Sequence, residues 1–309
     1  FLRCGHVTEA RAWGLWLHRS IAGKPSDLRI MYGLAGERRL AEWEAEWLPG
    51  YQGAKPVRIG NGAAGQLQLD VYGEVIAALS HARHEGSSIT RDGWNLQLSV
   101  IAHLETIWHL PDEGIWETRG GRQHFTFSKL MAWVALDQAI RSAERNGLPA
   151  PLEIWHGLRA RIHAEICARG FNPRRGSFVQ CYEGSDLDAS LLLMARSGFL
   201  PLDDPRIIGT IDAIAADLID DGLVRRYRSA DGLADHEATF LPCSFWLAEA
   251  YARLGRQDAA RTLFDRLLGL ANDVGLLAEE YDPVQARQMG NFPQALTHTA
   301  LISAALLIE

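Results

Sequence analysis

Two loops of the chain carry glutamates in settings that suit acid–base chemistry. In GIWETRGG, Glu117 follows Trp116 and precedes a glycine-rich turn, and in LLAEEYDP, Glu279 and Glu280 follow an apolar run. A carboxyl group held against an indole is poorly hydrated, which favours its protonated form near neutral pH. A carboxylate at the buried end of an apolar run has to be hydrogen-bonded or functional. One loop thus offers a proton donor and the other a proton acceptor.

Paired carboxylates from separate loops are the groups that hydrolysis of a glycosidic bond needs. One protonates the leaving oxygen, and the other activates water or attacks the sugar carbon. Both loops also have a structural alternative: Glu117 could pair with Arg119, and Glu279 with Glu280 could be a solvated surface pair. The residue types alone therefore indicate a carboxylate-lined pocket and leave its ligand open.

Three glycines precede the first of these loops in the spacing G-x-G-x-x-G, at Gly60, Gly62 and Gly65. A dinucleotide site with this fingerprint needs a strand before the glycines, a helix after them and then a second parallel strand. Downstream, apolar residues recur every four positions between 67 and 79, and no Val/Ile-rich run follows. We therefore interpret the glycines as a tight turn before a helix.

Composition excludes several classes of protein. The 309 residues are 47% hydrophobic and carry a net charge of −7, which argues against a nucleic-acid partner. No apolar run reaches the roughly 18 residues of a membrane span. Cys4, Cys167, Cys181 and Cys243 lie far apart, without the spacing of a metal or redox pair, so we expect buried, reduced thiols. We expect a cytoplasmic protein with no metal and no cofactor.

Helices are the elements that must hold these loops. Ser88 and Pro151 stand at expected helix starts, and Gly147, Gly222 and Gly255 at expected ends. Strand signals are few and short, so the sequence predicts an all-α fold. Apolar residues at helical spacing predict segments at 8–21, 66–83, 89–109, 125–146, 151–169, 186–198, 205–221, 240–254, 257–271 and 292–308.

The links between these helices alternate in kind. Short links such as RNGLPA and LGRQD are followed by long loops rich in Gly, Trp, Tyr, Arg and carboxylates, and each long loop leads into a helix. The residues suited to chemistry all lie on the long loops. Repeated helical hairpins with such loops predict an (α/α) barrel, as a single domain over residues 1–309, with the loops gathered around a pocket at one end.

Six stretches of the chain together resemble the catalytic domain of glycoside hydrolase family 15, which holds the glucoamylases and their bacterial relatives, among them trehalases. The likeness runs in order along nearly the whole chain. The resemblance implies an (α/α)6 toroid of inner and outer helices, and hydrolysis of α-glucosidic bonds with inversion at the anomeric carbon. The stretches are GNGAAGQLQLDVYGEV, PDEGIWETRGGRQHFTFSKLMAWVALD, YEGSDLDASLLL, LPCSFWLAEA, NDVGLLAEEYDP and GNFPQALTH.

The resemblance also implies roles for single residues. Glu117, in IWE, is similar to the family's general acid, and Glu279, the first Glu of AEEYD, is similar to its general base. Arg226 and Tyr227, in RRY, resemble the family's substrate-contacting Arg-Tyr, and Trp116 is expected to stack on a sugar ring. Further candidates for substrate contact are Gln68, Asp70, Arg119, Lys129, Glu280, Tyr281 and His298.

Some of these candidates have structural alternatives. Gln68 and Asp70 stand at the start of an expected inner helix, where they could serve as caps. His298 could equally be a hydrogen-bonded core histidine. Asp186 and Asp188, in GSDLDAS, are expected to cap the helix that they open.

The chain also departs from the family pattern. Its opening FLRCG matches the end of the second barrel helix. The first helix, most of the second, the Arg-Asp loop between them and the N-terminal β-sandwich domain are therefore expected to lie outside this sequence. Uncovered apolar faces would favour pairing with that N-terminal part or with another copy of the chain. Where fungal members place a tryptophan, this chain has GAAG, which argues against polymer-binding subsites. A tighter, shorter pocket suits a disaccharide such as trehalose or isomaltose at least as well as starch.

The leading interpretation is an exo-acting, inverting α-glucoside hydrolase that releases β-glucose and is glucoamylase-like in its substrates. A trehalase or isomaltose-type disaccharide hydrolase of the same family is the alternative within that class. Two alternatives lie outside it. One is a lyase or phosphorylase with the same toroid, which a carboxylate at position 279 disfavours. The other is an inactive or sugar-binding fragment.

Overall fold

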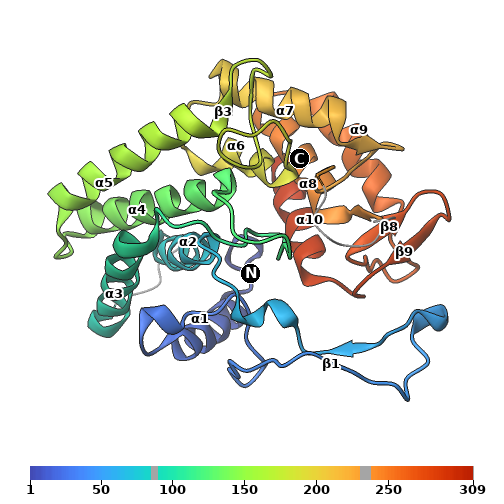
Figure 1. Cartoon of the computed structure of the whole chain (residues 1–309), viewed down its shortest axis with the longest axis horizontal. Coiled ribbons are helices and arrows are strands. Elements are labelled where there is room, and N and C mark those ends of the chain that lie inside the picture. Colours follow the sequence, from blue (N-terminus) through green and yellow to red (C-terminus); the bar gives the residue numbers. More distant parts are fainter. Residues whose placement is uncertain (85–89, 230–237, 309) are drawn as a thin grey trace. The chain divides into compact units, whose positions relative to one another are not determined.

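The computed structural model describes residues 1–84, 90–229 and 238–308. In these parts of the chain, ten α-helices are joined by short 3-10 segments, one π-helical turn and strands of two or three residues (Figure 1). The all-α fold expected from the sequence is therefore confirmed.

The chain divides into two compact units. Unit 1 consists of Phe1–Gln123 with Met131–Arg161, and unit 2 of His124–Leu130 with Ile162–Glu309. Two helices, α4 (Thr126–Asn146) and α5 (Leu152–Glu165), contribute residues to both units.

Unit 1 is built on three further helices, α1 (Val7–Ile21), α2 (Asp70–His84) and α3 (Arg91–Ile107), and the short 3-10 segment η1 (Leu2–Cys4) precedes them. All three α-helices lie where the apolar periodicity predicts them. Their ends differ from the predicted ends by a few residues, because apolar spacing marks the buried face of a helix and not its termini.

Helix α3 shows how a local signal sets a helix start. Its N-cap is Thr90, whose hydroxyl oxygen accepts a hydrogen bond from the Gly93 backbone N–H at 3.0 Å. The start expected at Ser88 lies outside the described residues. Trp94 and Leu104 belong to the buried face of the helix, as its apolar spacing predicts.

Helices α2 and α4 approach each other closely inside unit 1. A Cβ at Gly73 would lie 2.4 Å from the carbonyl oxygen of Met131, so only glycine allows this approach. About three helical turns further along, the Arg83 guanidinium donates to Ser142 Oγ at 2.8 Å. Because α2 begins at Asp70, this packing fixes the position of that carboxyl group.

A long segment separates α1 from α2. Its strands β1 (Trp43–Glu44) and β2 (Arg58–Ile59) pair antiparallel, with Trp43 opposite Ile59, and β1 lies on a hairpin that extends away from α1 (Figure 1). The ring centroids of Trp43 and Trp47 are 5.5 Å apart, and both rings are exposed. The segment also holds the 3-10 helices η2 (Pro25–Asp27), η3 (Tyr51–Gly53) and η4 (Gly62–Gly65).

The glycines of the G-x-G-x-x-G pattern form a turn, as expected. Gly60 has a φ of 82°, and a Cβ there would lie 2.2 Å from the carbonyl oxygen of Ala41. Gly62 and Gly65 bound the helix η4. The strand before them, β2, pairs antiparallel with β1 and has no parallel partner in its two-stranded sheet. This topology is not the one that a dinucleotide site requires.

Unit 2 continues from α5 through a π-helical turn, η5 (Ile166–Gly170), into short paired strands and helices. Helix α7 packs against β4 and η6. The elements in order are β3 (Phe171–Asn172), β4 (Ser177–Phe178), η6 (Ala189–Leu193), α6 (Met194–Ser197), α7 (Pro205–Asp217), β5 (Ile219–Asp220) and β6 (Leu223–Val224).

Three helices form the C-terminal part of unit 2: α8 (Leu241–Arg253), α9 (Gln257–Leu268) and α10 (Ala295–Ile308). Helix α8 is buried along nearly its whole length and packs against both α9 and α10 (Figure 1). The strands β7 (Thr239–Phe240), β8 (Glu280–Asp282) and β9 (Arg287–Met289) form an antiparallel sheet in the order β7-β8-β9.

Three expectations about unit 2 are wrong in detail. The segment predicted as one helix over 186–198 is the 3-10 helix η6 followed by the short helix α6. Asp188 caps η6 by accepting from the Ser190 backbone N–H at 2.8 Å, whereas Asp186 precedes the cap. Helix α7 ends at Asp217, so Gly222, with a φ of 71°, serves the turn between β5 and β6 and ends no helix.

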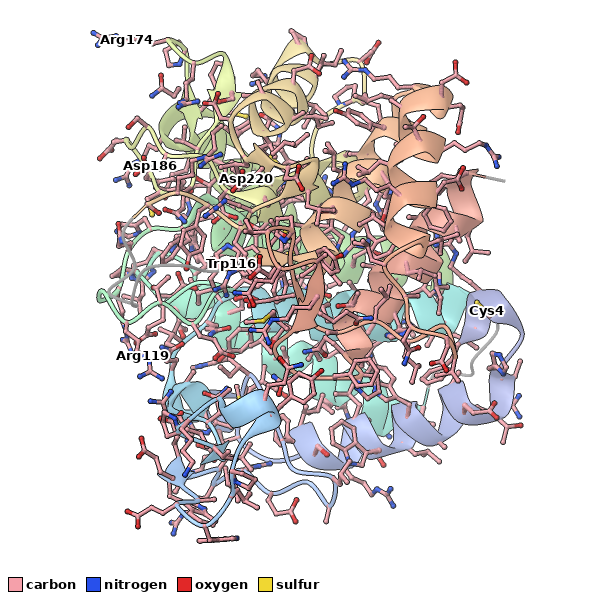
Figure 2. All side chains as sticks on the ribbon, turned by 90° about the vertical axis from the view of Figure 1, so that its right-hand side faces the viewer. Cys4, Trp116, Arg119, Arg174, Asp186 and Asp220 are labelled. Atoms are coloured by element: carbon pink, nitrogen blue, oxygen red, sulfur yellow. The ribbon has the colours of Figure 1, made fainter. Side chains whose placement is uncertain are left out.

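The four cysteines are free thiols. Their expected burial is wrong for three of them: Cys4 is exposed (Figure 2), Cys167 and Cys181 are half-buried, and Cys243 is buried. Cys4 lies in η1, a 3-10 segment in which no residue is buried.

No helix in the described residues is long and apolar enough to cross a bilayer. Across those same residues, no cluster of three or more His, Cys, Asp or Glu side chains is arranged to hold a metal ion.

Candidate active site

The first group of candidate residues lies in unit 1, on the loop between α3 and α4. Glu117 has a φ of 56°, a left-handed conformation that a non-glycine residue adopts at a cost of about 1 kcal/mol or more. The neighbouring Thr118 helps to hold it, because its hydroxyl donates to the carbonyl oxygen of Glu113 at 2.9 Å. Trp116, on the other side, is 7% exposed. The expected position of the Trp116 indole against this carboxyl group stays a prediction.

The carboxylate of Glu117 has a specific partner. Asn61 Nδ2 donates to Glu117 Oε2 at 3.2 Å. The sequence offered Arg119 as an alternative ion-pair partner. Its Nη2 lies instead 3.8 Å from Glu42 Oε2. Figure 2 shows Arg119 at the surface and Trp116 among packed side chains. Glu117 is thus held by an amide and not by a guanidinium in its own loop.

Unit 1 also holds two buried aspartates, Asp112 on the same loop and Asp70 at the start of α2. Asp112 is fully buried and accepts a hydrogen bond from the Leu69 backbone N–H at 2.8 Å. Asp70, the first residue of α2, is 6% exposed, and its Oδ1 has no hydrogen-bond partner among the described residues. Burial, reinforced by the charges of Asp112 and Glu74, raises the pKa of Asp70 to about 8. Asp70 is therefore protonated at neutral pH and can donate a hydrogen bond.

Gln68 lies in the short segment between η4 and α2, two residues before Asp70. Its amide donates to Gln66 Oε1 at 3.0 Å, and Gln66 in turn donates to the carbonyl oxygen of Thr118 at 3.3 Å. Gln68 also lines a cavity of about 240 Å³ in unit 1, together with Tyr72 and His103. Burial raises the pKa of Tyr72 to about 12. Gln68 thus connects the loop of Glu117 to a polar cavity.

The second group of candidate residues lies in unit 2, around Glu279. Its carboxylate accepts three hydrogen bonds: from the Asn291 backbone N–H at 3.1 Å, from Asn291 Nδ2 at 3.0 Å and from Gln294 Nε2 at 3.3 Å. Gly290 has a φ of 73°, and a Cβ there would lie 2.8 Å from Glu279 Oε2. Several donors on one carboxylate stabilise its ionised form, which is the form that a general base requires.

Glu280, the next residue along the chain, has a raised pKa. It lies on β8 opposite Phe240 of β7 and Met289 of β9. Burial raises the pKa of Glu280 to about 7, against the lowering effect of the nearby Arg226 and with a further rise from Glu279. The two adjacent glutamates therefore have different surroundings: Glu279 accepts three hydrogen bonds, whereas burial dominates at Glu280.

Arg226 and Tyr227 lie together near Glu280. The Arg226 guanidinium carbon is 5.7 Å from the ring centroid of Tyr227 and 5.4 Å from that of Phe240, which is within the range of cation–π contact. The Arg226 carbonyl oxygen accepts from the Ala189 backbone N–H at 2.8 Å. The expected Arg-Tyr pair is thus fixed at the end of the β7-β8-β9 sheet.

His298 contacts the backbone through its ring, and Lys129 is buried. His298 Nδ1 lies 2.7 Å from the carbonyl oxygen of Gln294, and the Leu277 backbone N–H approaches Nε2 at 3.4 Å. Both ring nitrogens thus contact the backbone and the residue is half-buried, so contact of His298 with substrate stays a prediction. Lys129 is fully buried near the start of α4; burial first, and then the charges of Lys129 and Arg169, lower the pKa of His124.

Tyr281 is part of the sheet itself. Its carbonyl oxygen accepts from the Thr239 hydroxyl at 2.7 Å, and its side chain is half-buried. Its backbone therefore has a structural role, and contact of its side chain with substrate stays a prediction.

Three residues around the glutamates were missed by sequence reasoning: Asn61, Asn291 and Gln294. The signal was present for the latter two, because GNFPQALTH is one of the stretches that carry the family resemblance. Asn61 stands between two glycines before a short helix, where a capping role is the ordinary expectation. Its second contact, to a residue 56 positions away, has no signal in the local sequence.

Comparison with known proteins identifies the family. The profile described as glycosyl hydrolases family 15 matches residues 1–306. A trehalase of Mycolicibacterium smegmatis is 44% identical over 287 residues, 92% of this chain and 43% of that protein. A trehalase of Thermoplasma acidophilum is 38% identical over 306 residues, 99% of this chain and 52% of that protein. The chain thus spans about half the length of these curated relatives.

Solved structures share the fold. A glycosidase variant in complex with glucose superposes with a TM-score of 0.76 at 21% identity, over 99% of this chain and 84% of that chain. The glucoamylase of Saccharomycopsis fibuligera gives a TM-score of 0.64 at 13% identity, over 78% of this chain and 70% of that chain. The resemblance and the fold class expected from the sequence are both confirmed: the chain belongs to glycoside hydrolase family 15.

Proposed function

We propose that the protein is a trehalase that hydrolyses the α,α-linkage of trehalose with inversion, with Glu117 as general acid and Glu279 as general base. The observation that carries the substrate is the identity of 44% over 92% of the chain to a protein named trehalase. The glucoamylases among the solved structures share 12–15% identity with the chain, which supports the fold and not the substrate. The disaccharide alternative therefore replaces the glucoamylase-like interpretation that led in the sequence.

Glu117 suits the role of the acid. It follows the buried Trp116 in the chain, and its Oε2 accepts a hydrogen bond from Asn61, which leaves Oε1 to face the substrate and deliver a proton. The reaction begins as this group transfers its proton to the glycosidic oxygen, so that the bond from that oxygen to the anomeric carbon can break and the second glucose can leave as a neutral sugar.

Glu279 suits the role of the base. Its three hydrogen-bond donors favour the carboxylate, and it takes a proton from the water whose oxygen bonds to the anomeric carbon. At the end of the reaction Glu117 is ionised and Glu279 is protonated, and exchange with solvent restores both. Arg226, beside Tyr227 and Glu280, is proposed to donate hydrogen bonds to sugar hydroxyls.

The stereochemistry of the products tests this mechanism. Inversion of α,α-trehalose gives one β-glucose from the attacked ring and one α-glucose from the leaving ring, because only one anomeric carbon reacts. We expect equal early signals of the two anomers in proton NMR, with maltose and isomaltose hydrolysed more slowly. Two α-anomers would contradict inversion, and faster hydrolysis of maltose than of trehalose would contradict the substrate.

Glutamine variants test the residues. We expect Glu117→Gln and Glu279→Gln each to lower kcat on trehalose by about a hundredfold or more, with the circular dichroism spectrum unchanged. Glu144→Gln is a matched control, because this carboxylate has a half-exposed side chain and pairs with His156, and we expect its activity to be unchanged. Near-normal turnover in either active-site variant would contradict the assigned role.

A further inference from the structure

We infer that Asn61 is the positioning residue of the general acid: its amide fixes which oxygen of Glu117 carries the proton and stabilises the carboxylate that forms when the proton leaves. The inference rests on the proposed role of Glu117. Both residues lie in unit 1, and Asn61 Nδ2 is 3.2 Å from Glu117 Oε2.

The orientation of the Asn61 amide follows from its other contact. Asn61 Oδ1 accepts a hydrogen bond from the Ala63 backbone N–H at 2.8 Å. Since a backbone N–H can only donate, the oxygen of the amide has to face Ala63, and the NH2 group has to face Glu117. The Asn61 backbone is fixed as well, because its N–H donates to the Leu40 carbonyl oxygen at 3.0 Å.

A donor facing Oε2 determines where the proton of Glu117 resides. An NH2 group offers no lone pair, so a proton on Oε2 would have no acceptor there and would displace the hydrogen bond. The proton therefore resides on Oε1, which is the oxygen left to face the substrate. When Oε1 gives up its proton, negative charge spreads to Oε2, and the amide hydrogen bond becomes stronger at that moment.

The loop of Glu117 is held to the segment of Asn61 along its length, so this contact has a rigid support. Leu67 exchanges two hydrogen bonds with Glu113: its N–H donates to Glu113 Oε2 at 2.9 Å, and its carbonyl oxygen accepts from the Glu113 N–H at 3.0 Å. Leu69 N–H donates to Asp112 Oδ2 at 2.8 Å. The left-handed backbone of Glu117, with its φ of 56°, is thus imposed by contacts on the same two segments.

Comparison of two substrates separates a role in proton donation from a structural one. Trehalose needs a proton on its leaving oxygen, whereas α-glucosyl fluoride expels fluoride, the anion of a far stronger acid than a sugar hydroxyl, and needs little help from a general acid. In both reactions the C1 bond to the leaving group breaks, water oxygen bonds to C1, and the water proton passes to the base. Only the requirement for the acid differs.

Asn61→Ser is the informative variant, because serine can still cap Ala63 but is too short to reach Glu117. We expect kcat on trehalose to fall by about tenfold to a hundredfold, with KM little changed. On α-glucosyl fluoride we expect the fall to be much smaller. Asn61→Asp, which keeps the shape and the cap while replacing the donor, is the second variant, and the same selective loss is expected.

Asn172→Ser is the matched control in unit 2. Asn172 also uses its oxygen locally, accepting from the Arg174 backbone N–H at 3.0 Å, and its NH2 group to donate across a loop, to the Gly184 carbonyl oxygen at 2.9 Å. It contacts neither glutamate among the described residues. Any loss in this variant is expected to be equal on the two substrates.

Equal losses on trehalose and α-glucosyl fluoride in the Asn61 variants, or no loss at all, would overturn the inference. Glu117→Gln, measured on the same pair, separates this failure from that of the proposed function. If Glu117→Gln loses trehalose activity selectively and the Asn61 variants do not, only the inference about Asn61 fails. If Glu117→Gln loses both activities equally, the role of Glu117 as the acid fails.

Discussion

The two proposed catalytic glutamates are the same residue type in opposite environments. Glu117 has one amide donor and a buried indole beside it, whereas Glu279 has three donors. The two proposed roles therefore rest on neighbours that the local sequence reveals only in part.

Asp70 gives a prediction about pH and stability. Burial raises the pKa of Asp70 to about 8 from a usual value of 3.8. Between these two pH values the carboxyl group of Asp70 is protonated in the folded protein and ionised in the unfolded chain. The stabilisation is complete below the unfolded value and is lost as pH rises to about 8, at up to roughly 1.4 kcal/mol per pH unit. Asp70→Asn removes the titration, so we expect the variant to gain stability relative to the parent between pH 5 and pH 8.

Urea unfolding at pH 5 and pH 8 measures this difference. Asp186→Asn is the control, because it makes the same change of charge at an exposed position of unit 2 (Figure 2). We expect no trend with pH in the control. A constant stability difference between Asp70→Asn and the parent at both pH values would contradict the protonation of Asp70.

At the scale of elements, the sequence predicts the helices well and the loops poorly. Apolar spacing identifies the ten helical segments, because burial of one face repeats along each helix. It does not distinguish the 3-10 helix η6 from an α-helix, because both bury residues three or four apart. The contact between Asn61 and Glu117 joins residues 56 positions apart and depends on how two loops fold together. The two glutamates could therefore be proposed from the sequence, whereas the contact of Asn61 with Glu117 could not.

The turn before α10 gives a prediction at this scale. A Cβ at Gly290 would lie 2.8 Å from Glu279 Oε2, so Gly290→Ala is expected to displace the carboxylate and to lower kcat about tenfold or more. Because Gly290 has a φ of 73°, the variant should also lose about 1 kcal/mol of stability. Steady-state kinetics and thermal unfolding of the same preparations measure the two effects.

Gly255→Ala provides the control for this turn. Gly255 has nearly the same φ, 74°, and a Cβ there would meet no atom within 4 Å. It should lose comparable stability and keep its kcat. If both variants kept full activity, the cradle around Glu279 would tolerate a side chain at position 290, and the expected close fit would be refuted.

For the whole molecule, the two helices that contribute residues to both units bear on how the chain unfolds. Helices α4 and α5 run from one unit into the other without a break in their hydrogen bonding. Because helix formation is cooperative along the length of a helix, we expect the two units to unfold together.

The division into units has an optical consequence. Of the 10 tryptophans, all except Trp246 belong to unit 1, so intrinsic fluorescence reports almost entirely on that unit, whereas far-ultraviolet ellipticity reports on the helices of both. Emission and ellipticity followed through one denaturant titration should give coincident transitions if the shared helices make unfolding cooperative. An emission change that preceded the loss of ellipticity would instead mark unit 1 as the part that melts first.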